Sequence, residues 1–203
     1  MRYSAFIALL STALALAFPS VAQQPQTVRL RGAIQAIDGP NLTVKSRNGD
    51  VVKVRLADNA RASAIVKASV ADLKPNTYIG VTSVPAPDGS DKAVAVHIFP
   101  EERRGTAEGR MAWDLLPDSK MTNGAVNLQV EGVQGGLMTV TYKGQESKIV
   151  LMPETKIVAF TNGEKSELKP GTQIIIFAAT RNEDGTLQAP AISYGRDGLT
   201  PPM

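Results

Sequence analysis

The turn Leu73-Lys74-Pro75-Asn76 returns 95 residues later as Leu168-Lys169-Pro170-Gly171. A second turn, Asp88-Gly89, returns 96 residues later as Asp184-Gly185. Pro, Gly, Asn and Asp favour tight turns, so these markers divide the chain into segments of similar length. The nearly constant offset predicts that one small β-module was duplicated within the chain.

Both copies show the same order of predicted elements. Alternating apolar residues predict three strands within residues 28–56, with Asn48-Gly49 as a hairpin turn between the second and the third. The Ala-rich stretch 60–73 predicts a helix or helical turn, and two more strands follow, at 78–84 and 92–99. The second copy repeats this order with strands predicted over 126–133, 137–143, 146–152, 156–160, 172–179 and 187–194.

Three strands, a connecting element and two further strands are the order of an OB-type five-stranded barrel. An open β-sandwich fits the same pattern. The predicted fold is mainly β, with two tandem small OB-like barrels joined by an ordered linker. The expected division is a signal peptide at 1–22, a first OB-like domain at 27–99, a linker at 100–125, a second OB-like domain at 126–195 and a C-terminal tail at 196–203.

The N-terminal residues 1–22 have the pattern of a secretory signal. Arg2 precedes an uncharged apolar run over residues 5–18, and small residues lead to a predicted cleavage after Ala22. The run is too short to span a bilayer, and no later segment is long and apolar enough to do so. We therefore expect a soluble protein exported to a bacterial periplasm, and the chain has no cysteine to form disulfides there.

The motifs resemble those of uncharacterised bacterial periplasmic proteins with tandem OB-like domains of unknown function. The resemblance rests on a hydrophobic-Gly-x-Ile start at residues 30–34, the Asn48-Gly49 hairpin and the two Leu-Lys-Pro turns. It covers most of residues 27–195 and implies a fold and a compartment, without an established activity. Proteins of this kind are sometimes labelled metal-transporter permeases, which the lack of a predicted membrane span contradicts.

Basic residues gather in the first copy. Residues 27–99 carry ten Lys and Arg against six Asp and Glu, whereas residues 126–195 carry six against seven. Side chains two apart point to the same side of a strand. Six cations are therefore expected on one outward face of the first three strands: Arg29, Arg31, Lys45, Arg47, Lys53 and Arg55.

This basic face has two interpretations. It could bind a polyanion or an anionic surface, because phosphate-rich ligands are drawn to such a field. It could equally be a solvated face that keeps the strands soluble. The three strands contain no Phe, Tyr or Trp on which bases could stack, so we expect no nucleic acid as partner.

The linker contains the only tryptophan, Trp113, and is therefore expected to be ordered and packed. In one interpretation it is a binding loop with Trp113 as an apolar anchor. Its polar contacts would then come from Arg103, Arg104, Glu108 and Asp114. In the other interpretation it is a strap between the domains, and Trp113 fills a seam.

Catalytic and metal-binding patterns are weak in this sequence. His97 is the only histidine, and zinc or copper sites usually need several His or Cys ligands. No nucleophile elbow and no phosphate-binding Gly-rich loop is present. We expect no metal, no cofactor and no enzyme activity. The expected function is a periplasmic binding or interaction module for an unknown periplasmic protein or an anionic envelope ligand, with an enzyme of unrecognised site as the alternative.

Overall fold

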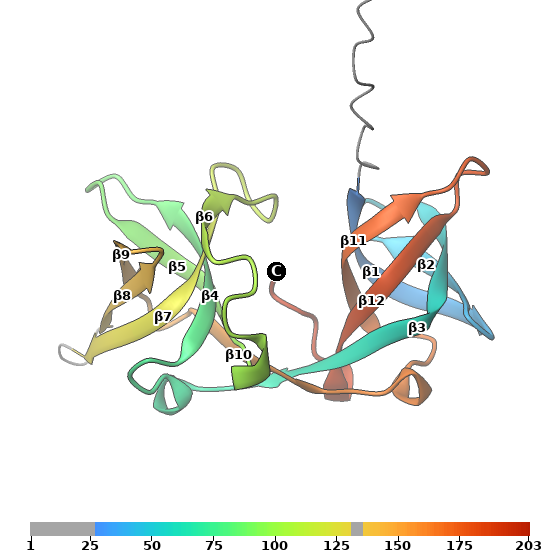
Figure 1. Ribbon diagram of the computed structural model, residues 1–203. Coiled ribbons are helices and arrows are strands. Elements are labelled where there is room, and N and C mark those ends of the chain that lie inside the picture. Colours follow the sequence, from blue (N-terminus) through green and yellow to red (C-terminus); the bar gives the residue numbers. More distant parts are fainter. Residues whose placement is uncertain (1–26, 131–135) are drawn as a thin grey trace, which may run out of the picture.

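The computed structural model describes residues 27–130 and 136–203 and is mainly β (Figure 1). Figure 1 shows two groups of strands side by side, connected by long strands that cross between them. The predicted signal peptide at 1–22 lies outside the described residues, as do the last residues of the strand predicted over 126–133. Among the described residues, no helix is of a length and hydropathy that would let it cross a membrane.

Five strands close a first barrel. They pair in the order β1 (Thr27–Asp38), β2 (Asn41–Ser46), β3 (Val51–Lys67), β12 (Leu187–Gly195) and β11 (Gln173–Arg181), with β11 returning to β1. β3 and β12 run parallel, and the other four pairs are antiparallel. Alternate side chains such as Leu42, Val44 and Val54 point inward and are buried with Ile176 in the core of this barrel.

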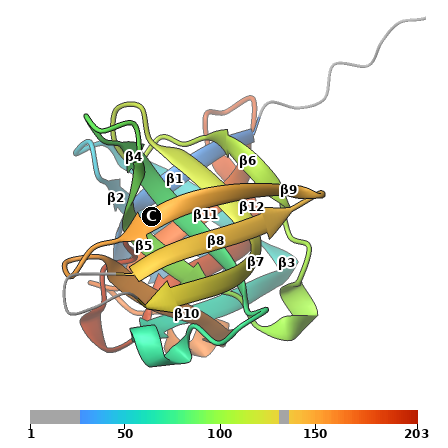
Figure 2. The same cartoon turned by 90° about the vertical axis from the view of Figure 1, so that its left-hand side faces the viewer.

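Five other strands pair in a second ring, which faces the viewer in Figure 2. They are β4 (Tyr78–Pro85), β5 (Asp91–Ile98), β7 (Lys120–Val130), β8 (Gly136–Tyr142) and β9 (Gln145–Leu151). The pairs Asp91↔Ile149 and Lys92↔Val150 join β5 to β9 in parallel and complete the ring. A short strand, β6 (Gly109–Ala112), adds to the edge of β7.

The second half of β3 connects the two groups. It pairs with β12 along one edge and with β10 (Lys156–Asn162) along the other, where Ile65 lies opposite Phe160. β10 in turn runs parallel to β5. Four short 3₁₀ helices complete the described elements: η1 (Val70–Asp72), η2 (Glu101–Arg103), η3 (Lys165–Glu167) and η4 (Arg196–Gly198).

Of the helix or helical turn predicted within residues 60–73, only the single turn η1 forms. β3 continues as a strand to Lys67, and Ala64 and Ile65 within it are fully buried. A strand hydrogen-bonded along both edges overrides the helical preference of an Ala-rich stretch, because pairing and burial outweigh local propensity. The consequence is that β3 carries the chain out of the first barrel and toward the second ring.

The expected pairing of 27–99 with itself and of 126–195 with itself is also wrong. The first three strands of each half pair with the last two strands of the other half. Thus β1, β2 and β3 meet β11 and β12, while β7, β8 and β9 meet β4 and β5. The extended course of β3 and its counterpart β10 makes this exchange possible, since each strand leads away from the strands that precede it.

The two Leu-Lys-Pro turns make equivalent contacts across this exchange. The amide of Asn76 donates to the carbonyl of Val126 at 2.8 Å, and the amide of Gly171 donates to the carbonyl of Ile34 at 2.7 Å. Asn76 and Gly171 both have positive φ, at 64° and 89°, a conformation that Gly and Asn tolerate.

The boundary predicted for the linker, 100–125, is too long at its C-terminal end. β7 begins at Lys120, and the linker contributes β6 to the same sheet. Gly124 in β7 sits so close to the carbonyl of Thr141 that an added Cβ would lie 2.3 Å from it, and Gly32 in β1 sits equally close to Lys45, at 2.1 Å. The predicted tail, 196–203, packs inward at the seam between the two groups, where Met203 is buried beside Ile65 and Phe160.

Candidate functional site

A groove of about 820 Å³ lies at one end of the first barrel. The start of β1, the turn between β2 and β3 and the turn between β11 and β12 form its walls. Five cations line it, against three carboxylates: Arg29, Arg31, Arg47, Lys53 and Arg181, with Asp50, Asp114 and Asp184. The excess of positive charge is suited to an anionic ligand.

The groove exists because β1 begins before β2 can pair with it. β2 pairs with β1 only from Gly32 onward, and the last contact is a hydrogen bond of 2.8 Å from the amide of Arg47 to the carbonyl of Arg31. The absence of a Cβ at Gly32 allows the backbone of Lys45 to approach there. Before this point the two strands diverge, and the side of β1 that faces the groove has no paired strand among the described residues.

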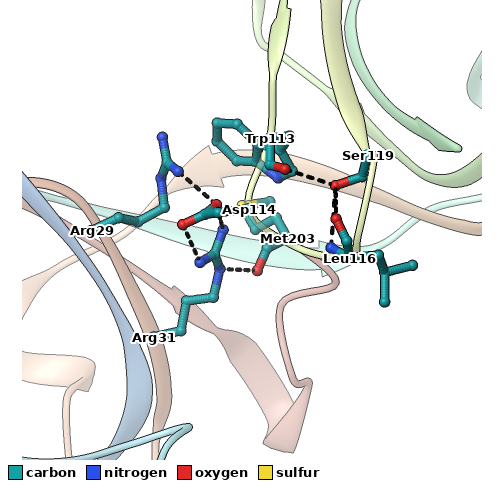
Figure 3. A network of polar contacts seen from close by, with 7 residues as sticks. All are labelled: Arg29, Arg31, Trp113, Asp114, Leu116, Ser119 and Met203. Atoms are coloured by element: carbon teal, nitrogen blue, oxygen red, sulfur yellow. Dashed lines mark hydrogen bonds and ion pairs between the residues drawn. The ribbon is translucent and has the colours of Figure 1, made fainter.

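The linker reaches across to the start of β1 (Figure 3). Asp114 accepts hydrogen bonds from Arg29 Nη1 at 2.6 Å and from Arg31 Nη2 and Nη1 at 2.6 and 3.0 Å. The guanidinium carbon of Arg29 lies 3.8 Å from the centroid of the Trp113 ring. Two sets of residues that the sequence predicted as separate sites, the basic face and the linker, therefore meet in one cluster.

Electrostatics at this cluster follow from its two arginines. Hydrogen bonds from Arg31, followed by the charges of Arg31 and Arg29, lower the pKa of the Asp114 carboxyl to about 2. The pKa of Arg47 is also lowered, first by desolvation and then by the positive charge of Arg31 nearby. Arg31 further donates from Nε to the carbonyl of Met203 at 2.5 Å, which ties the C-terminal residues to the groove wall.

A single serine shapes the tip of the linker. Ser119 Oγ lies 2.9 Å from the carbonyl of Trp113 and 2.8 Å from that of Leu116, and it accepts a hydrogen bond of 3.1 Å from the amide of Leu116. The amide of Trp113 donates to the carbonyl of Ser119 at 2.8 Å. These contacts, drawn in part in Figure 3, hold the loop that presents Trp113 and Asp114 to β1.

The six residues of the predicted basic face do not all lie at the groove. Arg29, Arg31, Arg47 and Lys53 line the groove, whereas Lys45 and Arg55 do not. Only 26% of the Arg29 side chain and 11% of the Arg31 side chain are exposed, because the linker covers them. Arg55 instead lies 3.9 Å from the exposed carboxylate of Asp58.

The remaining predicted linker residues contact other parts of the molecule. Arg103 lies 4.5 Å above the ring of Phe160, at the seam. Arg104 binds Glu101 and donates to the carbonyl of Asn76 at 2.8 Å. Glu108 accepts a hydrogen bond of 2.8 Å from the amide of Lys143 in the second ring. These three contacts fit the interpretation of the linker as a strap.

His97 is buried on β5 beside β10, at the seam, where its Nδ1 lies 3.1 Å from the carbonyl of Gly80. Burial lowers its pKa to about 4, against the opposing effect of hydrogen bonds with the carbonyls of Gly80 and Pro202. In residues 27–130 and 136–203, no group of three His, Cys, Asp or Glu side chains is placed to hold a metal ion.

Sequence reasoning missed Arg181 and Asp184, which flank the turn between β11 and β12. Asp184 stabilises this turn by accepting hydrogen bonds from the amide and hydroxyl of Thr186, at 2.9 and 2.6 Å. The turn was recognisable from Asp184-Gly185, but its place beside β1 depends on the exchange of strands. Comparisons of the chain with family models, with curated proteins and with solved structures found no match.

Proposed function

We propose that this protein is an exported, non-enzymatic binding module that holds an anionic ligand in the groove of the first barrel. The observation that carries the proposal is the gathering of five cations around about 820 Å³ of open space. They come from elements far apart in the chain, and two of them already bind a carboxylate, that of Asp114. This internal carboxylate shows in geometric detail how an acidic group can be bound at the groove.

We further propose that the architecture consists of two OB-like barrels derived from a duplicated unit. The strand order of the first barrel and the five-stranded ring of the second support this proposal, as do the equivalent contacts of Asn76 and Gly171. OB-folds commonly bind ligands on their second and third strands and at the loops between the first and second and between the fourth and fifth strands. Of these parts, β2, β3 and the turn between β11 and β12 line the groove of the first barrel.

The proposed location is the bacterial periplasm, with residues 1–22 as the export signal. Its support is the sequence pattern of these residues and the resemblance to periplasmic proteins. Expression of the full chain in a bacterium, followed by fractionation and N-terminal sequencing, tests it. A mature N-terminus after Ala22 in the periplasmic fraction is expected, and an uncleaved cytoplasmic chain would contradict the proposal.

Binding of inorganic polyphosphate, measured by calorimetry, tests the groove. We expect Arg47→Gln, Lys53→Gln and Arg181→Gln together to weaken binding at least roughly tenfold, and binding to fall as salt is raised. The matched control removes three positive charges outside the groove, with Lys45→Gln, Arg55→Gln and Lys67→Gln. Equal affinity of the two triple variants would overturn the groove as the site.

A further inference from the structure

Among the described residues, the start of β1 has one edge without a paired strand. Thr27, Val28, Leu30 and Arg31 pair with β11 on one side, with a shift of register at Arg29. On the other side, β2 pairs with β1 only from Gly32 onward. The carbonyl of Arg31 already points to this second side, since it accepts from the amide of Arg47. Backbone groups two residues apart in a strand point the same way, so the amide and carbonyl of Arg29 also face the groove. An open edge of this kind is a template for another strand.

The equivalent edge in the second ring is occupied. In the first barrel, Ile174 lies opposite Gly32, and in the second ring, Ile79 lies opposite Gly124. The start of β1 and the start of β7 therefore occupy matching positions. At the start of β7, the linker strand β6 pairs antiparallel with residues 120–123. The same position beside β1 is the groove. The molecule therefore contains, beside β7, an example of a strand that the described residues do not supply beside β1.

The neighbours of β6 indicate which side chains a strand beside β1 would need. Arg110 of β6 lies opposite Thr122 and binds the carboxylate of Asp91 at 2.6 Å. The counterparts of Thr122 and Asp91 in the first barrel are both apolar and buried, namely Leu30 and Leu187. The position of Arg110 would accordingly be taken by an apolar side chain in a ligand of the first barrel.

The neighbouring positions of such a strand would face Arg29 and Arg31, because alternate residues of a strand point to opposite sides. These two arginines bind a carboxylate already, and Arg47 and Lys53 add positive charge to the same groove. Acidic side chains are therefore favoured at these positions. The edge and its surroundings together select a pattern in which acidic and apolar residues alternate.

We infer that the free edge of β1 binds an extended segment of a partner protein, with alternating acidic and apolar residues, as an added antiparallel strand in the position that β6 takes beside β7. Backbone hydrogen bonds to the amide and carbonyl of Arg29 supply affinity in this mode of recognition, and the alternating side chains supply selectivity. The inference rests on the proposed function, because it names the ligand of the same groove.

The probe is a short capped peptide of alternating Glu and Val. The control peptide has the same sequence and charge but carries N-methyl groups on the amides that would face β1. We expect the first peptide to bind and the N-methylated peptide to bind at least roughly tenfold more weakly, since it cannot form the ladder. Equal binding of both peptides would mean attraction of charge alone and would overturn strand addition.

A matched pair of variants tests the same edge from the side of the protein. Arg29→Ala and Arg29→Pro both remove the guanidinium, but only the proline removes the amide that faces the groove. Proline is tolerated at an edge strand when its nitrogen faces outward, and thermal unfolding of both variants checks the fold. We expect Arg29→Pro to bind the Glu-Val peptide several-fold more weakly than Arg29→Ala, and both to bind polyphosphate equally.

The outcomes separate the two proposals. Binding of polyphosphate without binding of the peptide would overturn strand addition and leave the anionic groove intact. Binding of neither probe would overturn both. If Arg29→Pro does not fold, the pair of peptides with the unaltered protein still decides the question.

Discussion

The starts of β1 and β7 occupy matching positions, yet among the described residues a strand covers only the start of β7. Beside β7, the linker contributes β6 and places Arg110 against Asp91. Beside β1 there is a groove with an excess of positive charge, and the linker contributes Trp113, Asp114 and Leu115 at its rim. The difference teaches that one linker covers the start of β7 with β6 and, by continuing past β6, shapes the open end of the first barrel.

The largest expected effect is at Leu73, which tests the exchange of strands. Leu73 lies in the first half of the sequence but is buried in the core of the second ring. Leu73→Ala should lower the free energy of unfolding by about 3 kcal/mol, because it leaves a cavity. Hydrogen exchange should show protection lost first in β7, β8 and β9. Its counterpart Leu168 is only partly buried against the core of the first barrel, so Leu168→Ala should cost less. Loss of protection in β1 and β2 after Leu73→Ala would contradict the exchange.

A change of pH sharpens the comparison of the two groups of strands. His97 of β5 occupies the position that Ser193 of β12 occupies in the first barrel, so only β5 has a histidine there. The unfolded chain takes up a proton on His97 near pH 6.5, whereas burial lowers the folded pKa to about 4. The unfolded state therefore binds more protons between these values, and the free energy of unfolding should fall by on the order of 3 kcal/mol as the pH decreases from 6.5 to 4.

Urea unfolding at a series of pH values measures this slope, and His97→Gln should flatten it. Two strongly paired carboxyls, Asp114 and Glu167, also have lowered pKa values of about 2, but their usual values are 3.8 and 4.5. Their stabilising effect is lost only below these usual values, so the range from 4.5 to 6.5 reports on His97. A slope that persists in His97→Gln would assign it to another group.

Substitution of Asp91 should loosen β6 from the start of β7 and so make this edge resemble the open edge of β1. Its ion pair with Arg110 is mostly buried, with 21% and 20% of the two side chains exposed. Asp91→Ala should lower the free energy of unfolding by about 2 kcal/mol, because the guanidinium of Arg110 loses its charged partner. Hydrogen exchange should accelerate in β6 more than in β4. Unchanged exchange in β6 would show that its backbone pairing alone holds it.

The smallest expected effect concerns the rim of the groove. Asp114→Asn should release Arg29 and Arg31 from their internal carboxylate and change the free energy of unfolding by no more than about 1 kcal/mol, since the carboxylate is 52% exposed. Affinity for polyphosphate, measured by calorimetry, should rise roughly fivefold. Asp50→Asn is the matched control at the opposite wall. A weaker affinity in Asp114→Asn would assign Asp114 a positioning role instead.

Much of the strand pattern was predictable from the sequence, whereas the partners of each strand were not. Alternation around Leu42, Val44 and Val54 shows which side chains are buried, and all three lie in the core of the first barrel. The same alternation does not say which strand completes the sheet. The path of the chain from the first barrel to the second ring depends on residues 60–67. Their Ala-rich composition favours a helix, but their place between β10 and β12 requires a strand.

The candidate site was predictable only in parts. The cations of β1 and the packing of Trp113 both followed from residue type and spacing. Their contact did not, because Arg29 and Asp114 are 85 residues apart in the chain. Arg181 was missed for the same reason, since it reaches the groove through β11, a strand of the other half.

The interleaved course of the backbone sets an order of assembly. A polypeptide that emerges N-terminus first delivers β1, β2 and β3 long before β11 and β12, so the first barrel has to wait for the last strands to arrive. All strands of the second ring lie between residues 78 and 151 and are complete earlier. A chain that is truncated before β11 and β12 therefore has no finished groove, and the first barrel closes only after the last strands have been synthesised.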